Sequence, residues 1–254
     1  MQQRLAIVTG AAGDIGRAIA QRLKQDHDVV VLADLDLTAA QNAAHGLGAG
    51  FVAMQVDVTN PQACADLAAA VAPLGQVACL VNNAGAAWGA SLHQTTPESW
   101  AKDRALNFDG NYLMFHALAD QLIAGKGSVI NVASVNGLGV YGHPAYSAAK
   151  AGMIHLTRAI AVEYGQYGVR ANSVAPGTVR TQAWEARAAN NPDVFKDAAE
   201  HYPLGRIVLP EDVAHAVGFL ASASAISGVC LPVDCGLSAG IPALARTFSQ
   251  TEDY

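Results

Sequence analysis

A short apolar run and a glycine-rich turn near the N-terminus decide the fold, since residues 5–16 are LAIVTGAAGDIG. Residues 5–8 are apolar without alternation, which is typical of a strand covered by helices on both faces. Gly10, Gly13 and Gly16 permit a sharp turn into a helix and a close approach of the backbone to a ligand. Because the start of a helix attracts phosphate, this turn is a candidate nucleotide site. An ordinary strand-to-helix connection is the alternative.

The same succession of a short apolar run and a helical segment continues along the chain. Runs predicted as strands are 5–8, 29–32, 51–56, 77–81, 128–132, 169–174 and 230–233. Helices are expected near 15–25, 38–46, 61–72, 98–123, 145–165 and 210–222. This alternation predicts an α/β fold with a doubly wound (Rossmann) seven-stranded parallel sheet and helices on both faces. No linker or repeat divides the 254 residues, so a single domain is expected over 1–254.

Composition predicts a large buried core and excludes several function classes. The chain is 52% hydrophobic and 14% charged, with a net charge of -6 and no cluster of Lys or Arg, so nucleic acid is not an expected partner. No apolar stretch approaches the ~20 residues of a membrane span, and no signal peptide is recognisable, so a cytoplasmic location without a membrane partner is expected. The cysteines, Cys64, Cys79, Cys230 and Cys235, include no C-x-x-C pair and are expected to be reduced thiols, with no metal site.

Two segments interrupt the alternation. Residues 177–206 are too long for an ordinary connection and are predicted to form a substrate loop, with a plain surface excursion as the alternative. Residues 237–254 form a C-terminal tail that could be an arm, an interface segment or a frayed end.

A carboxylate ends the second predicted strand. Asp34 lies eighteen residues beyond Gly16, where it can accept hydrogen bonds from the adenosine ribose and would repel a 2′-phosphate. Its alternative role is to cap a turn or helix. Because Arg17 is the only nearby cation, NAD is favoured over NADP.

A tyrosine and a lysine four residues apart are the candidate reactive pair. On a helix, Tyr146 and Lys150 share one face, and the Lys150 ammonium can favour the ionised form of the phenol. Ser134 follows the strand 128–132 at the sheet edge where ligands bind, so one loop could bring both hydroxyls to one carbonyl. Taken alone, these residues could be a surface pair and a turn serine; their occurrence together with the glycine-rich turn favours catalysis.

With these motifs in this order, the chain resembles the short-chain dehydrogenase/reductase family in its compact single-domain branch, from Thr9 to Gly236. Further motifs that carry the resemblance are Asp57-Val58, Asn82 to Gly85 (NNAG), Asn107, Asn172, Pro176-Gly177, Thr181 and Val233-Asp234.

The resemblance implies a role for each matching residue. Tyr146 would be the acid/base, Lys150 would lower its pKa and hold the nicotinamide ribose, and Ser134 would orient the carbonyl. Asn107 would hold a water in the proton relay. Residues implied to contact NAD are Gly10, Asp14, Ile15, Gly16, Asp34, Asp57, Val58, Asn83, Ala84, Gly85, Tyr146, Lys150, Pro176, Gly177, Val179 and Thr181.

Two residues depart from the family pattern. Asp14 stands where the compact branch usually has Gly, and the resulting glycine spacing is similar to the extended branch of epimerases and dehydratases. The Asp14 carboxylate can cap the helix, but its charge would weaken pyrophosphate binding unless it turns away. Cys235 replaces the usual Gly after Val233-Asp234, near where family members pack subunits.

The sequence therefore predicts an NAD-dependent oxidoreductase that interconverts a secondary alcohol and a ketone. The alternatives are an epimerase or dehydratase that uses bound NAD transiently, and a non-catalytic dinucleotide sensor. The small-molecule alcohol or ketone is the expected partner, and the resemblance implies a homotetramer or homodimer. Candidates for the substrate pocket are Trp88, Asn136, His143, Trp184 and Arg187, with His93, Tyr141 and Gln182 as further possibilities.

Overall fold

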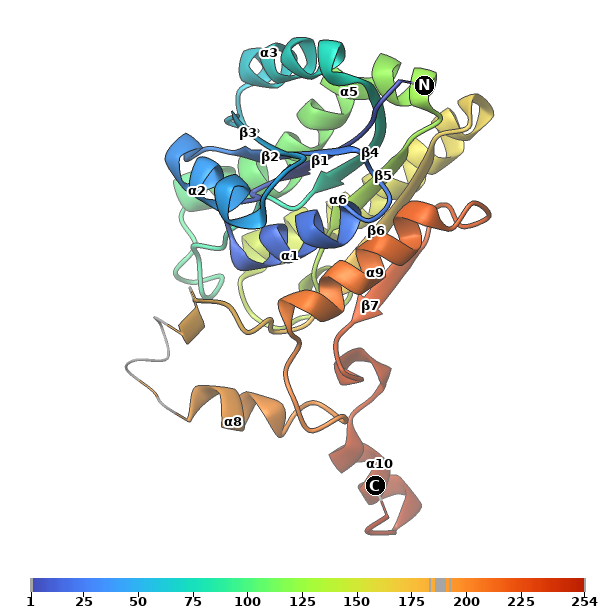
Figure 1. The fold of residues 1–254 in the computed structure, drawn as a ribbon. Coiled ribbons are helices and arrows are strands. Elements are labelled where there is room, and N and C mark those ends of the chain that lie inside the picture. Colours follow the sequence, from blue (N-terminus) through green and yellow to red (C-terminus); the bar gives the residue numbers. More distant parts are fainter. Residues whose placement is uncertain (1, 183, 186–190, 192, 254) are drawn as a thin grey trace.

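The computed structural model describes residues 2–182, 184–185, 191 and 193–253. Within them, seven strands form one parallel sheet in the order β3-β2-β1-β4-β5-β6-β7 (Figure 1). The strands are β1 Arg4–Thr9, β2 Val29–Asp34, β3 Phe51–Gln55, β4 Gln76–Asn82, β5 Ser128–Val132, β6 Arg170–Pro176 and β7 Cys230–Val233. The order reverses between β1 and β4, which is where ligands bind in open sheets of this kind. All seven predicted strands and the doubly wound fold are confirmed.

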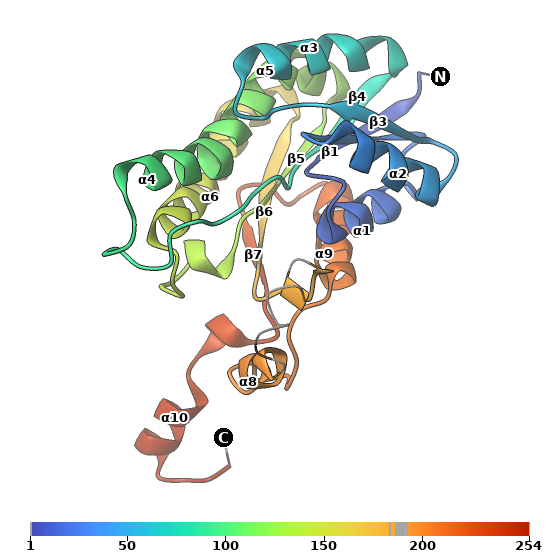
Figure 2. The same cartoon turned by 90° about the vertical axis from the view of Figure 1, so that its left-hand side faces the viewer.

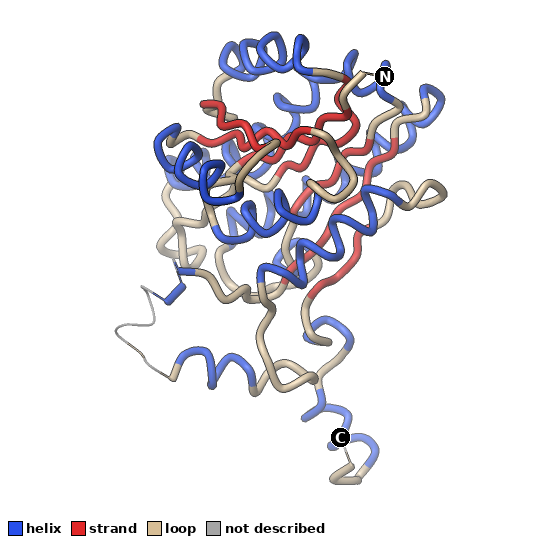
Figure 3. Tube along the Cα trace, viewed as in Figure 1, coloured by secondary structure: helices blue, strands red, loops and turns tan. Residues whose placement is uncertain are grey.

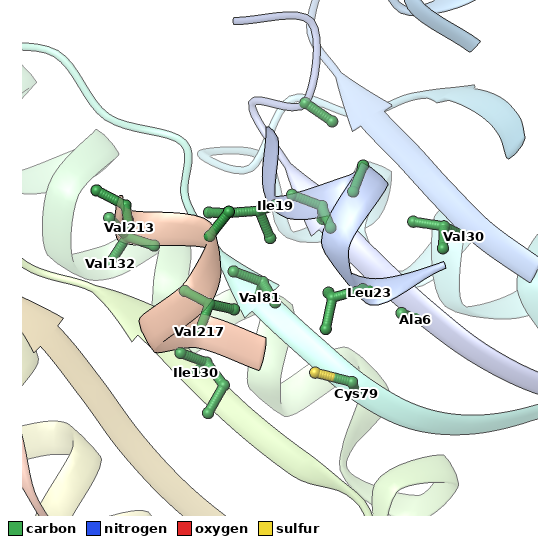
Figure 4. Packing of buried hydrophobic residues seen from close by; sticks show 14 of the residues in the cluster. Ala6, Ile19, Leu23, Val30, Cys79, Val81, Ile130, Val132, Val213 and Val217 are labelled. Atoms are coloured by element: carbon green, nitrogen blue, oxygen red, sulfur yellow. The ribbon is translucent and has the colours of Figure 1, made fainter. Parts of the chain in front are cut away.

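Helices cover both faces of the sheet. One face carries α1 (Asp14–Leu23), α2 (Leu37–Leu47) and α9 (Pro210–Ser222), and the other carries α3 (Pro61–Val71), α5 (Gly110–Gly125) and α6 (Pro144–Tyr164) (Figure 2). Side chains from α1 and α9 meet over the central strands, where Ile19 and Leu23 join Val213 and Val217 in one buried cluster (Figure 4). Full burial of each such aliphatic side chain contributes about 1.5–3 kcal/mol.

The helix predicted over 98–123 is not continuous. Helix α4 (Pro97–Arg104) is followed by a π-helical turn, η2 (Ala105–Asp109), before α5 begins. Two buried asparagines bond to carbonyls in this region: Asn107 Nδ2 donates to Asp103 O at 2.9 Å, and Asn111 Nδ2 donates to Asn107 O at 2.7 Å. Wide turns of this kind are frequent at functional sites, and a simple apolar periodicity does not predict them.

Two segments extend past the carboxyl ends of the strands. The first follows β6 and contains α8 (Val194–Ala199), and the second follows β7 and contains α10 (Pro242–Ser249) (Figure 3). In Figures 1 and 2, α8 and α10 lie away from the sheet, and neither helix contains a buried residue. None of the described helices is both long and apolar enough to cross a membrane.

The four cysteines are free thiols. Cys235, where the family usually has Gly, has a φ of +51°, and Gly236 follows it with a φ of +90°. A left-handed conformation is strained for a residue with a β-carbon, so the usual glycine has a physical reason at this position.

Candidate active site

The glycine-rich turn between β1 and α1 forms one side of the site. Gly10 has a φ of +60°, and a β-carbon there would lie 2.9 Å from Ala84 Cα. A β-carbon on Gly16 would lie 2.6 Å from Ala11 Cα, which is too close for any side chain. The backbone is therefore packed so tightly that only glycine fits at these two positions, as a turn that receives a phosphate group requires.

Asp14 does not cap helix α1, contrary to the expectation from the sequence. The N-cap is Gly13, without a side-chain cap, and Asp14 is the first helical residue. Its carboxylate forms an ion pair with Arg17 through Oδ1 and accepts a hydrogen bond from Gln182 N at 2.7 Å through Oδ2. The negative charge of Asp14 is therefore paired with Arg17 and hydrogen-bonded to the segment after β6. The side chain links the glycine-rich turn to that segment.

The end of β4 supports the glycine-rich turn from behind. Asn83 Nδ2 donates to Thr9 O at 2.9 Å and to Gly10 O at 3.1 Å. Thr9 Oγ1 accepts from the backbone N–H groups of Asn83 at 3.0 Å and Ala84 at 3.1 Å. Because its amide is bonded to the turn, Asn83 acts here by holding the backbone in place.

Asp34 lies at the carboxyl end of β2, as predicted. Its Oδ2 accepts from Ala12 N at 2.9 Å and its Oδ1 accepts from Asp36 N at 3.1 Å. An open depression beside it is lined by Asp34, Leu35, Asp36, Leu37, Thr38 and Gln55. The Asp34 carboxylate thus joins the glycine-rich turn to this depression.

Asp57 and Val58 follow β3. The Asp57 carboxylate accepts from Thr59 N at 2.9 Å and from Thr59 Oγ1 at 2.6 Å, so it stabilises its own turn. Val58 is buried, and a β-carbon on Gly110 would lie 3.0 Å from its Cγ2. The predicted contacts of both residues with NAD stay predictions.

Helix α6 positions the candidate reactive pair. It begins at Pro144, so Tyr146 lies in its first turn and Lys150 one turn later. Lys150 is only 2% exposed, and its Nζ donates to Val132 O at 2.8 Å and lies 5.5 Å from the centroid of the Tyr146 ring. Ser134, which follows β5, hydrogen-bonds to the Tyr146 side chain and contacts Asn136. The two hydroxyls and the ammonium therefore converge.

Burial opposes charge on both members of this pair. It raises the pKa of the Tyr146 phenol above its usual range, whereas the hydrogen bond with Ser134 lowers that pKa. Burial also lowers the pKa of the Lys150 ammonium to about 7. Both groups are therefore shifted toward their neutral forms, which is a common feature of functional sites.

Asn107 lies in the π-helical turn beside Lys150. Its Nδ2 donates to Ala86 O at 2.7 Å and its Oδ1 accepts from Ala86 N at 3.3 Å. A β-carbon on Gly85 would lie 2.8 Å from Asn107 Oδ1 and 3.3 Å from Lys150 Nζ, so Gly85 lets these two side chains approach. Asn107 holds the loop after β4, and its predicted link to a water stays a prediction.

A cavity of about 980 Å³ opens beside these residues. Of the residues singled out from the sequence, its lining includes Ile15, Asn83, Gly85, Ser134, Asn136, Tyr141, His143, Tyr146, Lys150, Pro176, Gly177, Val179, Thr181 and Trp184. Trp88 lies outside this lining, with Lys102 Nζ 4.2 Å from its ring centroid. Arg187 lies outside the described residues. The remaining candidates outside the lining are Gly10, Asp14, Gly16, Asp34, Asp57, Val58, Ala84, His93, Asn107 and Gln182.

The far wall of the cavity was anticipated only in part, because residues 198–202 lie in the segment predicted as a substrate loop, whereas no residue of 237–246 was singled out. It comprises Ala198, Glu200, His201, Tyr202, Leu237, Gly240, Ile241, Pro242, Ala243 and Arg246. Tyr202 is buried, and its hydroxyl accepts a hydrogen bond from Thr178 N at 2.7 Å. The lining residues of this wall follow no short sequence motif. Tyr202 could have been suggested from the sequence, because it lies in the long segment after β6. The described part of the chain contains no group of three or more metal-ligating side chains.

Comparisons with known proteins agree with this geometry. Residues 10–238 match a family model described as Enoyl-(Acyl carrier protein) reductase. A crystal structure of a short chain dehydrogenase/reductase family oxidoreductase from Burkholderia thailandensis is 42% identical, with a TM-score of 0.93 and full coverage of both chains. Cis-4-hydroxycyclohexanecarboxylate dehydrogenase from Sinomonas cyclohexanicum is 40% identical over 93% of this chain and 97% of its own. Meso-2,3-butanediol dehydrogenase from Serratia marcescens is 36% identical over 93% and 95%. The chain therefore belongs to the short-chain dehydrogenase/reductase family of oxidoreductases.

Proposed function

We propose that this protein is an NAD-dependent dehydrogenase that interconverts a secondary alcohol and a ketone by hydride transfer, with Tyr146 as the acid/base. The observation that carries the proposal is the convergence of Ser134, Tyr146 and Lys150 on one cavity beside the glycine-rich turn. Relatives named as dehydrogenases of a hydroxy acid and of a diol support the reaction class.

The residues present fit a nicotinamide dinucleotide. A β-carbon on Gly10 or Gly16 would clash with backbone, so the turn has room only for glycine, and it leads directly into the start of α1, which favours a pyrophosphate. Asp34 supplies a carboxylate for ribose hydroxyls at the end of β2 and would repel a 2′-phosphate, which favours NAD. A nicotinamide bound there would supply the acceptor for the hydride of the alcohol carbon.

The side chains of the site handle the proton. In oxidation, the Tyr146 phenolate accepts the hydroxyl proton of the alcohol, and in reduction the phenol returns it to the ketone oxygen. Ser134 steadies that oxygen by donating a hydrogen bond. The Lys150 ammonium offsets the charge of the phenolate, which burial otherwise opposes.

The test is the variant Tyr146→Phe assayed with a panel containing vicinal diols, cyclic hydroxy acids and cyclic alcohols. We expect wild type to produce NADH and Tyr146→Phe to lose at least about 100-fold in kcat, because general acid–base catalysis contributes that much. Calorimetric titration with NAD and the melting temperature should change little. Full activity in the variant would overturn the proposal.

The same experiment separates the alternatives. An epimerase or dehydratase would turn over its substrate without net NADH, and a sensor would bind NAD without turnover by wild type. Mass determination in solution tests the homotetramer or homodimer, which we propose from the family resemblance alone.

A further inference from the structure

One hydrogen bond joins two sides of the cavity. Asp14 Oδ2, at the start of α1, accepts from Gln182 N at 2.7 Å, although the two residues are 168 positions apart. Ile15, the residue after Asp14, lines the cavity. Thr181, the residue before Gln182, lines it too. The bond therefore connects the glycine-rich turn to the segment after β6 directly beside two lining residues.

The backbone amide of Gln182 depends on an acceptor from elsewhere in the chain. A helical turn begins at Gln182. Thr181 caps this turn, because its Oγ1 accepts from Trp184 N at 3.3 Å and its carbonyl accepts from Glu185 N at 2.8 Å. The first amides of a helix have no acceptor within the helix, and the cap serves the third of them here. The first amide is served by Asp14.

The segment after β6 is also held just before this turn. Arg180 N donates to Val208 O at 2.9 Å, and Val208 N donates to Thr178 O at 3.0 Å. These two bonds fix the backbone on one side of Thr181, and the bond from Gln182 to Asp14 fixes it on the other. The position of Thr181 in the cavity wall therefore depends on both attachments.

The Asp14 carboxylate is well placed to keep this bond. Its Oδ1 forms the ion pair with Arg17, one turn later in α1, which leaves Oδ2 to Gln182. The Asp14 side chain is only 17% exposed, so water competes little for it. Hydrogen bonds to a charged acceptor are about twice as strong as neutral ones. Glycine, the usual family residue at this position, has no side chain to form such a bond.

We propose that Asp14 is a positioning residue that holds the segment after β6 against the glycine-rich turn and thereby slows the release of NAD. The inference rests on the proposed function, because it takes NAD to occupy the cavity that the turn and the segment share. Residues from both line that cavity, so separating them opens the site and keeping them joined retains what is bound.

A role of Asp14 through charge alone predicts the opposite effect. A carboxylate at the start of a helix repels a pyrophosphate, so its removal would then tighten the binding of NAD and slow its release. If Asp14 holds the segment, its removal speeds release. The sign of the change therefore distinguishes the two roles.

The test measures the rate at which NADH leaves the protein, from the fluorescence change when excess NAD displaces it in a stopped-flow instrument. Asp14→Ala should raise this rate by about tenfold, the effect of one hydrogen bond to a charged group. Gln182→Pro should raise it equally, because proline lacks the N–H and fits the first position of a helix. Gln182→Ala is the matched control, since it keeps the N–H, and its rate should equal that of wild type.

The double variant Asp14→Ala/Gln182→Pro shows whether the two residues act through one bond. It should release NADH no faster than either single variant, because each substitution already removes the same interaction. Independent effects would multiply to about 100-fold and overturn the proposal. Slower or unchanged release from Asp14→Ala would overturn it as well.

Amide hydrogen exchange without NAD keeps this result separate from the proposed function. The exchange rates of the Arg180 and Trp184 amides, followed by NMR, should rise at least about threefold in Asp14→Ala and stay unchanged in Gln182→Ala. Unchanged exchange in Asp14→Ala overturns the role of Asp14, whether or not the protein oxidises an alcohol. A protein that fails to bind NADH contradicts the proposed function instead, and the exchange rates then decide whether Asp14 holds the segment.

Discussion

The two walls of the cavity are built differently. The wall formed by the ends of β1, β4 and β5 is held by side chains bonded to backbone, such as half-buried Asn83 to Thr9 and buried Lys150 to Val132. In the opposite wall, from the segments after β6 and β7, the described residues are joined by contacts such as the bridge between Val179 and Val208 and the hydrogen bond to Tyr202. Its helices α8 and α10 bury none of their residues.

This difference indicates that the two walls have different roles. A wall with dense packing and satisfied polar groups can hold a reactive geometry and a cofactor within narrow limits. A wall with few buried contacts can change shape at low cost, which suits a surface that selects substrates. Substitutions in the first wall are therefore expected to cost far more than substitutions in the second.

Lys150→Met should have the largest effect. We expect kcat to fall by about 100-fold or more, because the cation that stabilises the phenolate is removed. The melting temperature should rise by at least about 2 °C at pH 7, because burying the Lys150 charge destabilises the fold.

The pH dependence checks this reasoning. The pKa of Lys150 is about 7 when folded and near 10.5 when unfolded, so the unfolded chain binds more protons between these values and wild-type stability rises with pH there. The stability that Lys150→Met gains over wild type should therefore be greatest below pH 7 and decrease toward pH 10. Lys196→Met, on exposed α8, is the matched control and should change neither property.

Gly16→Ala tests whether the first wall tolerates an added β-carbon. A β-carbon there meets the Ala11 backbone, so we expect the affinity for NAD to fall by about 100-fold, or 2.7 kcal/mol. Gly13→Ala is the control, because its β-carbon would have only an ordinary contact, at 3.6 Å from Gly10 O. Calorimetric titration measures both. Equal losses in the two variants would contradict the close-approach argument.

Asp34→Ser should change selectivity more than activity. Loss of the carboxylate removes the repulsion of a 2′-phosphate, and we expect the preference for NAD over NADP to narrow by about tenfold. Asp36→Ser is the control, since Asp36 is the neighbouring carboxylate and caps α2 through Ala39 N at 3.0 Å. The ratio of kcat/KM for the two cofactors is the measurement. A wild-type enzyme that already uses NADP well would contradict the role of Asp34.

Ending the chain after Gly240 should have the smallest effect. This removes α10 and the lining residues from Ile241 to Arg246, so we expect KM for the alcohol to change by about three- to tenfold. KM for NAD and the melting temperature should stay close to the wild-type values, because α10 buries no residue. A large loss of NAD affinity would show that the second wall also supports the cofactor.

The elements that follow local rules could be predicted from the sequence. Continuous apolar runs predict buried parallel strands, and the glycines from Thr9 to Gly16 predict a sharp turn, although Asn83 and Asp34 also hold that turn in the structure. Tyr146 and Lys150 share a helix face through their spacing alone. The π-helical turn at Asn107 could not be predicted, because it breaks the regular helical period and its Asn107 side chain bonds to Ala86, which is distant in sequence.

By itself, then, the sequence determined the strands of the sheet and the order of the candidate catalytic groups, because each depends on periodicity or on residues a few positions apart. Only the tertiary structure decided that Asp14 accepts a hydrogen bond from Gln182 and that Tyr202 lines the same cavity as Ser134 and Tyr146. These contacts join segments far apart in the chain, and their geometry arises from the packing of whole helices on the sheet, which no short pattern encodes.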